Sequence, residues 1–295
     1  KNLLEISNKE IQKIRGNNIT TVFQEPMSSL NPLHTIEKQI KEILQTHSKI
    51  SNFNAQIKSK RLLESVGLEN LTERLKCYSY ELSGGQRQRV MIAMGIANNP
   101  DLLIADEPTT ALDVTIQLQI LNLLKKLQNE IGMAILFISH DLDVVKNFAD
   151  FICIMKDGVI VENNTKKNIF EKPQHFYTKK LISIKNLKKE KSKNNKNKIL
   201  QIENLKVWYP IKKGILKKTV SYVKAVDSID FNLFEKQTLG IVGESGSGKT
   251  SLVLAILKLI SFEGKIIFNN KNISKLKNKE LTKLRKDMQI IFQDP

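Results

Sequence analysis

One stretch decides the predicted fold: Leu239-Gly240-Ile241-Val242-Gly243-Glu244-Ser245-Gly246-Ser247-Gly248-Lys249-Thr250. Residues 243–250 fit the pattern G-x-x-x-x-G-K-[ST] of a phosphate-binding loop. The apolar run 239–242 predicts a buried strand before the loop, and the mostly apolar run 251–260 predicts a buried helix after it. Glycines between the two let successive backbone N–H groups point inward, and the helix N-terminus adds a partial positive charge. The stretch therefore predicts a site for a nucleoside triphosphate.

Two side chains of this loop have specific expected roles. Lys249 is expected to reach the β- and γ-phosphates, and the hydroxyl of Thr250 is expected to bind Mg²⁺. The alternative interpretation is a turn rich in glycine and serine, with a solvated lysine. A chance match to the whole pattern is rare, and the strand before it and helix after it favour nucleotide binding.

Length and composition limit the remaining possibilities. A chain of 295 residues can hold two domains, and a formal net charge of +17 raises nucleic acid or anionic lipid as partners. Half of residues 185–198 are lysine, and such a run is more often a solvated linker than a nucleic-acid site. Cys77 and Cys153 lack metal-ligand spacing, which favours a reducing compartment. No apolar run approaches the roughly 20 residues of a membrane span, so a membrane role is expected to come through a partner chain.

A repeat indicates a duplicated module. Residues 8–15 (NKEIQKIR) match residues 278–285 (NKELTKLR), and residues 22–26 (VFQEP) match residues 291–295 (IFQDP). We therefore expect a first module at 1–184, a linker at 185–198 and a second module at 199–295. The first copy is expected to lack its beginning and the second its end. The repeat predicts another G-x-x-x-x-G-K-[ST] with its lysine about 20 residues before Lys1, and a Ser-Gly-Gly-Gln roughly 57 residues after Pro295.

Polar side chains follow three predicted strands of the first module. Gln24 follows the β-branched run 19–23, and it can touch a metal ion or water, or simply satisfy a loop backbone group. Asp106 and Glu107 follow the buried strand 102–105, where doubly wound sheets bind ligands. Asp106 would hold Mg²⁺ through water and Glu107 would orient or deprotonate the attacking water, unless both are simply solvated acids.

His140 follows the third such strand, 134–138. It can donate a hydrogen bond to a terminal phosphate, or it can be a structural histidine.

Two further groups of candidate residues lie at the predicted starts of helices. In Leu82-Ser83-Gly84-Gly85-Gln86, Ser83 is a plausible N-cap and the bare glycine backbone at a helix N-terminus is a second anion site. Capping explains Ser83, but we do not expect it to explain two glycines followed by Gln86. Asp113 opens an amphipathic helix at 114–127 and need be no more than its N-cap.

The second module is expected to begin with a strand at 199–207. One ring of Trp208 or Tyr209 can stack on adenine, or both can pack on the sheet. Alternating apolar residues at 229–233 predict a half-buried antiparallel strand. Hairpins are expected at 151–161 and after 265–268, and helices at 36–46, 55–66 and 90–97.

Together these elements resemble the ATPase subunits of ABC transporters over nearly the whole chain except the linker. The resemblance implies an α/β P-loop NTPase fold, with a mixed or parallel core sheet, an antiparallel β subdomain and a helical signature subdomain. It implies ATP and Mg²⁺ as ligands. Its implied ATP-binding residues are Tyr209, Gly243, Glu244, Ser245, Gly246, Ser247, Gly248, Lys249, Thr250, Ser251 and Gln293.

The resemblance also assigns the other motifs. Glu107 is similar to the catalytic base, His140 to the switch histidine, and Gln24 and Gln293 to the metal-contacting Q-loop glutamines. The signature is Leu82, Ser83, Gly84, Gly85 and Gln86, the Walker B strand ends at Asp106, and the D-loop is 111–113, ending at Asp113.

In this family each ATP lies between the Walker A loop of one module and the signature of another. The second module's Walker A and the first module's signature would serve one ATP, whereas Asp106, Glu107 and His140 belong to another site. The chain alone is expected to have negligible ATPase activity, because neither site is complete.

Finer resemblance points to ATPases of peptide importers, of the fused double-ATPase form. The strings at 23–32, 109–115 and 175–178 are similar to oligopeptide and dipeptide importers, and those at 31–35 and 211–217 to the fused form. This implies transmembrane permease subunits, a solute-binding protein, paired modules in one chain and a peripheral place on the cytoplasmic face of the inner membrane. No nucleic acid is expected. The alternative is a soluble tandem ATPase acting on ribosomes or nucleic acid, which the charge suits but the short linker does not.

Overall fold

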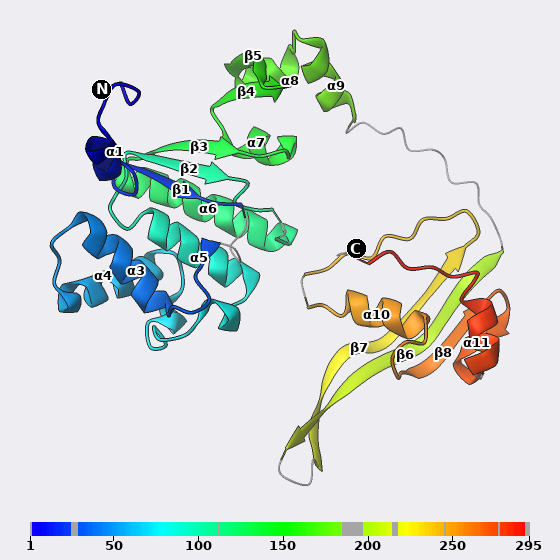
Figure 1. The fold of residues 1–295 in the computed structure, drawn as a ribbon. Coiled ribbons are helices and arrows are strands. Elements are labelled where there is room, and N and C mark those ends of the chain that lie inside the picture. The colour runs from blue at the N-terminus through cyan, green and yellow to red at the C-terminus, as the bar shows by residue number, and fades with distance from the viewer. Residues whose placement is uncertain are drawn as a thin grey trace. The chain divides into compact units, whose positions relative to one another are not determined.

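The structure is a computed structural model of the chain (Figure 1). It describes residues 2–24, 29–110, 112–184, 197–213, 218–244, 246–276 and 278–292. Contacts divide the chain into two compact units, Lys1–Leu187 and Lys188–Pro295.

A three-stranded parallel sheet forms the centre of the first unit. Strands β1 (Ile19–Val22), β2 (Leu102–Asp106) and β3 (Ala134–Ile138) lie in the order β1-β2-β3, and both pairs are parallel. The apolar run that predicted a central strand is confirmed as β2, although only one of its faces is fully buried. Because parallel strands run the same way, their carboxyl ends meet at one edge of the sheet.

Helices cover this sheet and build a further layer. Helix α5 (Gly84–Gly95) packs against β1, and α3 (Ile36–His47) and α4 (Asn52–Ser65) pack on each other and on α5 (Figure 1). Helix α6 (Val114–Ile131) places Ile120 and Leu124, both 0% exposed, in the same core as the β-strand residue Leu103. The expected helices of this region are confirmed, although α5 begins six residues before the predicted range of 90–97. Its short elements are α1 (Asn8–Ile14) and the 3₁₀ turns Glu69–Leu71 and Ser79–Glu81.

An antiparallel hairpin follows the sheet. Strand β4 (Phe151–Lys156) pairs with β5 (Val159–Thr165) through Asp157 and Gly158, whose φ angles of 49° and 80° fit a type I′ turn. The predicted hairpin at 151–161 is therefore confirmed. Helix α7 (Leu142–Phe148) precedes the hairpin, and α8 (Lys166–Glu171) and α9 (Phe176–Ile184) follow it.

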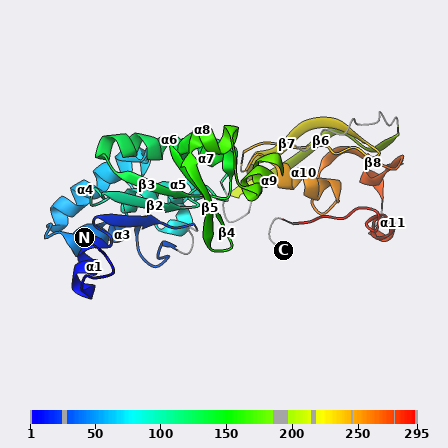
Figure 2. The ribbon, with the colours of Figure 1, turned by 90° about the horizontal axis from the view of Figure 1, so that it is seen from above.

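The second unit is built on an antiparallel sheet in the order β7-β6-β8-β9. Strands β6 (Lys198–Lys213) and β7 (Lys218–Phe234) lie side by side in both views (Figures 1 and 2), and α10 (Lys249–Ile256) lies against them. Strand β8 (Glu263–Phe268) turns through Asn269 and Asn270, both at positive φ, into β9 (Lys271–Asn272), as the hairpin prediction required. The 3₁₀ turn Ile273–Lys275 and α11 (Asn278–Leu284) follow.

The buried strand expected at residues 239–242 is wrong. This segment is not a strand, and Leu239, Ile241 and Val242 are 40%, 45% and 94% exposed. A strand needs neighbours that satisfy its backbone N–H and C=O groups, and among the described residues of the second unit none pairs with it. The helix after the loop is also shorter than expected: it ends at Ile256 and buries only Leu252 and Ala255.

Across the described residues, no helix combines the length and the apolar character that crossing a membrane requires.

Replacement of Leu124 by Ala should destabilise the first unit. The side chain is fully buried on α6, so truncation removes apolar contacts and leaves a cavity that costs about 2–5 kcal/mol. Amide hydrogen exchange along β2 measures this change without requiring the two units to unfold together. Leu118→Ala on the same helix is the matched control, because Leu118 is 54% exposed and its truncation should shift exchange little. Equal effects of the two substitutions would contradict the packing described.

Candidate functional site

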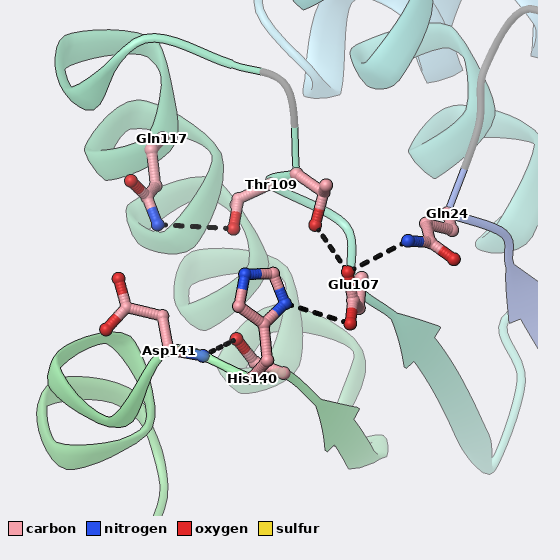
Figure 3. Close-up of polar contacts among 8 residues, drawn as sticks. Gln24, Glu107, Thr109, Gln117, His140 and Asp141 are labelled. Carbon is pink, nitrogen blue, oxygen red and sulfur yellow. Dashed lines mark hydrogen bonds and ion pairs between the residues drawn. The ribbon is translucent and has the colours of Figure 1, made fainter.

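Three strand ends of the first unit bring polar side chains together (Figure 3). Glu107 directly follows β2, Gln24 lies two residues after β1, and His140 lies two residues after β3. The Nε2 of Gln24 donates to Oε2 of Glu107 at 2.9 Å, and Nδ1 of His140 lies 3.0 Å from Oε1. The three side chains therefore meet at one edge of the sheet, with Glu107 at the centre.

The backbone holds Glu107 in an unusual conformation. Its φ of 45° is in the left-handed region, which a residue with a Cβ adopts at a cost. Its N–H donates to the carbonyl of Ile138 at 3.0 Å, which ties the end of β2 to the end of β3. The strain therefore serves to aim the carboxylate between Gln24 and His140.

Thr110, for which the sequence predicts no individual role, completes this cluster. Its hydroxyl donates to Oε2 of Glu107 at 2.8 Å, so two donors share one carboxylate oxygen. The preceding Thr109 receives a hydrogen bond from Gln117 at 3.4 Å (Figure 3). The feature of the sequence that could have indicated this contact is the pair of threonines directly after Glu107-Pro108.

Hydrogen bonds set the charge state of the cluster. The hydrogen bond from His140, followed by that from Thr110, lowers the pKa of Glu107 below its ordinary value, while desolvation acts in the opposite direction. Glu107 is therefore a carboxylate at neutral pH and can accept a proton or orient a water. The side chain of His140 is 71% exposed, so its ring also reaches solvent on the side away from Glu107.

Two local turns fix the loop that carries His140. The N–H of Asp141 donates to the hydroxyl of Ser139 at 3.0 Å (Figure 3), and the Asp141 side chain caps α7 by accepting from Asp143 N–H at 2.9 Å. Asp106 is the last residue of β2 and is partly exposed beside this loop, opposite Ile138 of β3 in the sheet register.

Packing explains one of the two glycines at the start of α5, and the pair also leaves the helix N-terminus open. A Cβ on Gly85 would lie 2.9 Å from the Ile116 side chain of α6, so the two helices approach too closely there for a larger residue. Ser83 and Gly84 are exposed. This helix start can therefore present its N–H groups to an anion.

The expectation that capping does not explain Gln86 is wrong. The Gln86 N–H donates to Ser83 Oγ at 3.3 Å, and the Ser83 N–H donates to Gln86 Oε1 at 3.0 Å. This reciprocal capping box accounts for both residues. Asp113 caps α6 in a similar way, accepting from Ile116 N–H at 2.9 Å. Because Ile116 also contacts the glycine pair, the starts of α5 and α6 lie next to each other.

In the second unit, the glycine-rich loop ends at the N-terminus of α10. Gly246 and Gly248 have φ angles of 81° and 90°, and a Cβ on Gly248 would overlap the carbonyl oxygen of Ala225. Nζ of Lys249 donates to the carbonyls of Gly243 and Glu244 at 2.7 and 2.6 Å. The ammonium group therefore lies inside the curve of the loop, where it can meet the negative charge of a phosphate.

Tyr209 lies beside this loop. Its hydroxyl donates to Ser251 Oγ at 3.3 Å, which places the ring next to the first turn of α10. Trp208 faces Tyr222 instead, with ring centroids 6.0 Å apart. Of the two candidate aromatics, Tyr209 is thus the one next to the phosphate-binding loop.

Some expected site residues lie outside the described part of the chain. They are Ser245, Gln293 and Ala111.

The chemistry of the donor set fits Mg²⁺. Among the described residues no group of three or more His, Cys, Asp or Glu side chains could hold a metal ion. Mg²⁺ commonly takes one or two protein oxygens and completes its shell with phosphates and water. The hydroxyl of Thr250 and the carboxylate of Asp106 are oxygen ligands of that kind, each in its own unit.

A glycine-rich loop at a helix N-terminus, found in the second unit, and acids at the end of a parallel strand, found in the first, are each typical of α/β nucleotide-binding proteins of the P-loop class. The sequence matches the family described as ABC transporter over residues 2–110 and 226–295. The chain belongs to this family, with the ABC ATPase fold.

Two relatives are similar to the chain over nearly its whole length. The chain is 50% identical to the peptidoglycan transport ATP-binding protein YejF of Agrobacterium fabrum over 297 residues, which cover 100% of this chain and 54% of that protein. It is 41% identical to the glutathione import ATP-binding protein GsiA of Shigella flexneri, covering 99% of this chain and 52% of that protein. The chain thus spans about half the length of these relatives.

A solved structure is also similar. The dimeric post-hydrolysis state of the ATP-binding cassette MJ0796, bound to ADP and Pi, is 33% identical with a TM-score of 0.48, over 55% of this chain and 68% of that chain.

Replacement of His140 by Ala should raise the pKa of Glu107 toward its ordinary value, because the largest cause of the lowered value is removed. Carboxyl carbon NMR during an acid titration measures the midpoint. In the unaltered chain the lowered pKa means that Glu107 stabilises the fold above its unfolded pKa, and that this contribution is lost as pH falls through the folded pKa. Asn168→Ala, remote from the cluster, is the control; an unchanged Glu107 midpoint in the His140 variant would exclude the contact.

Proposed function

We propose that the chain binds Mg-ATP and forms part of the ATP-hydrolysing subunit of an ABC importer. The observation that carries the proposal is the loop at 243–251, with Lys249 inside its curve and Tyr209 beside it. Phosphates would accept from the loop N–H groups and Lys249, and adenine would stack on Tyr209. Ser251 and Gln293 complete the proposed ATP-binding set, with the loop residues given above.

Hydrolysis is proposed to use the cluster around Glu107. A carboxylate with a lowered pKa, held by Gln24, Thr110 and His140, can orient the water that attacks the γ-phosphate in line. His140 would steady the terminal phosphate through its exposed edge. Mg²⁺, held through Thr250 or Asp106 with a Q-loop glutamine, would supply neutralising charge on the phosphates.

We further propose that the chain carries parts of two ATPase modules. Residues 1–184 would supply signature, Walker B and switch histidine, and residues 199–295 would supply the adenine-stacking aromatic and Walker A, joined by the linker 185–198. The exposed start of α5 fits a signature that contacts ATP held by a paired module. Asp113 at the start of α6 would contribute to the same surface as the D-loop.

The proposed solute is a peptide or a peptide-like compound. The two relatives are named for transport of peptidoglycan and import of glutathione, which both contain amino acids linked by amide bonds. Transmembrane permease subunits and a solute-binding protein would be the partners, with the chain at the cytoplasmic face of the inner membrane. The alternative, a soluble tandem ATPase acting on ribosomes or nucleic acid, has no support among these relatives.

The permease contact is proposed to lie just after the first Q-loop. Leu33 is 83% exposed there, and a hollow of about 650 Å³ lies alongside α3. The hollow is lined by His34, Thr35, Glu37, Lys38, Lys41, Glu42, Gln45, Thr46 and Asn52. An exposed leucine that directly precedes His34, a residue of the hollow, suits a partner helix with an apolar end.

Replacement of Lys249 by Ala should weaken Mg-ATP binding by roughly 30-fold or more, because charge-assisted hydrogen bonds to phosphate are lost. Isothermal calorimetry on the purified chain measures the affinity. Lys286→Ala is the matched control, since Lys286 is an exposed lysine of the same unit. No detectable Mg-ATP binding by the unaltered chain, or equal affinity of both variants, would overturn the proposal.

Replacement of Leu33 by Asp should reduce co-purification of the permease chains with the whole subunit, since a charge is placed in the proposed apolar contact. Mg-ATP affinity should not change. Leu118→Asp is the control, as Leu118 is also exposed but lies on α6. Undiminished recovery of the permease chains would place the contact elsewhere.

A further inference from the structure

Among the described residues of the second unit, one half of the long hairpin has no helix or further strand packed on it. Strands β6 and β7 pair as far as Lys213 and Lys218 and run on past α10 and β8 (Figure 1). Residues 210–213 and 218–224, here called the distal ribbon, are all exposed. The proximal half differs, because Leu205, Val207 and Val226 are nearly fully buried in the core of the unit.

The distal ribbon exposes large apolar side chains in water. Ile211 is 39% exposed, Val220 61%, Tyr222 52% and Val223 53%. Two paired strands without a third strand or a helix against them are marginally stable in water. By the strand register Tyr222 lies on one face and Ile211 and Val223 lie on the other, so the ribbon exposes apolar side chains on both faces. Exposed apolar side chains of this size are typical of a surface that another molecule covers.

The charged side chains of the ribbon are all lysines, so its charge is positive. No Asp or Glu occurs between Glu203 and Asp227, and the described part of this interval contains Lys206, Lys212, Lys213, Lys218 and Lys224. The three lysines of the distal end, at 212, 213 and 218, are all exposed.

At the proximal boundary of the ribbon, where Trp208 pairs with Lys224, the Trp208 ring has the ammonium groups of Lys224 and Lys206 at 4.4 and 5.6 Å from its centroid. The ribbon thus combines lysines, aromatic rings and aliphatic side chains.

We propose that the distal ribbon binds the surface of an anionic phospholipid bilayer. Lysines near such a surface are attracted to the headgroup charge, and Tyr and Trp rings suit the headgroup level, where one end of the ring is apolar and the other wet. Ile211, Val220 and Val223 would enter the boundary of the acyl chains. Nucleic acid fits less well, because exposed aliphatic side chains gain nothing from a phosphate backbone and the Trp208 ring already faces two lysines.

This inference concerns a second surface of the second unit. The lysines at 212, 213 and 218 are not part of the phosphate-binding loop, so failure of the lipid proposal would leave Mg-ATP binding unchanged. Loss of Mg-ATP binding would leave the ribbon unchanged in the same way.

The test is flotation of the purified full chain with phosphatidylcholine vesicles that contain phosphatidylglycerol. A triple variant, Lys212→Gln, Lys213→Gln and Lys218→Gln, should bind these vesicles roughly 100-fold more weakly, at about fivefold per lysine. The matched control, Lys271→Gln, Lys275→Gln and Lys286→Gln, makes the same change of net charge at exposed positions of the same unit. The affinity of this control for the vesicles should fall less than about 10-fold, because those lysines do not lie on the ribbon.

A second variant tests the apolar part. Ile211→Ser with Val220→Ser should keep binding at low salt but lose the portion that persists at high salt, since screening removes only the charge term. Mg-ATP affinity measured in parallel shows that each variant is folded.

Equal loss in both lysine triples, or equal binding to vesicles of phosphatidylcholine alone, would overturn the proposal. So would failure to bind vesicles together with ribbon-dependent binding of a short single-stranded RNA, which would assign the surface to nucleic acid.

Discussion

Parallel backbone pairing between β1, β2 and β3 is the constraint on which the first unit depends. It places the ends of three strands, far apart in the sequence, at one edge of the sheet. Gln24 and His140 can meet Glu107 only because these strands share a direction and a register. The left-handed backbone of Glu107, tied to Ile138, completes the arrangement. The chemistry of the cluster therefore rests on backbone hydrogen bonds several residues away from it.

Close approach of backbone and helix explains the glycines that the motifs contain. Gly248 touches the carbonyl of Ala225 and Gly85 faces Ile116, so each glycine has a packing reason in the protein itself. The same positions leave helix N-termini bare, which is what phosphate binding needs. Packing and ligand chemistry thus require the same residue, and Ser83 and Gln86 likewise form a capping box.

The two units show how strongly an apolar segment depends on its neighbours. The run 102–105 becomes a central strand because β1 and β3 pair with it on either side. The run 239–242 has an equally apolar sequence but remains irregular and exposed, since no described strand of its unit pairs with it. The distal ribbon presents the reverse case: its strands pair, with one register shift between Ile211 and Lys212, but no described element of its unit buries either face.

The sequence by itself determined the strands, helices and turns whose signals are local. Alternating apolar residues, the N-cap Asp113 and the Asp157-Gly158 and Asn269-Asn270 turns act within a few residues of themselves, so the starts of β4, β5 and α6 and the end of β8 could be predicted. The sequence also predicted that Gln24, Glu107 and His140 each follow a strand, but it did not predict that these side chains contact one another. Only the tertiary structure decided that Thr110 joins them, that Tyr209 rather than Trp208 lies beside the loop, and that residues 239–242 are not a strand. These outcomes depend on which groups are available as neighbours in space, and that is a property of packing and pairing that no local pattern contains.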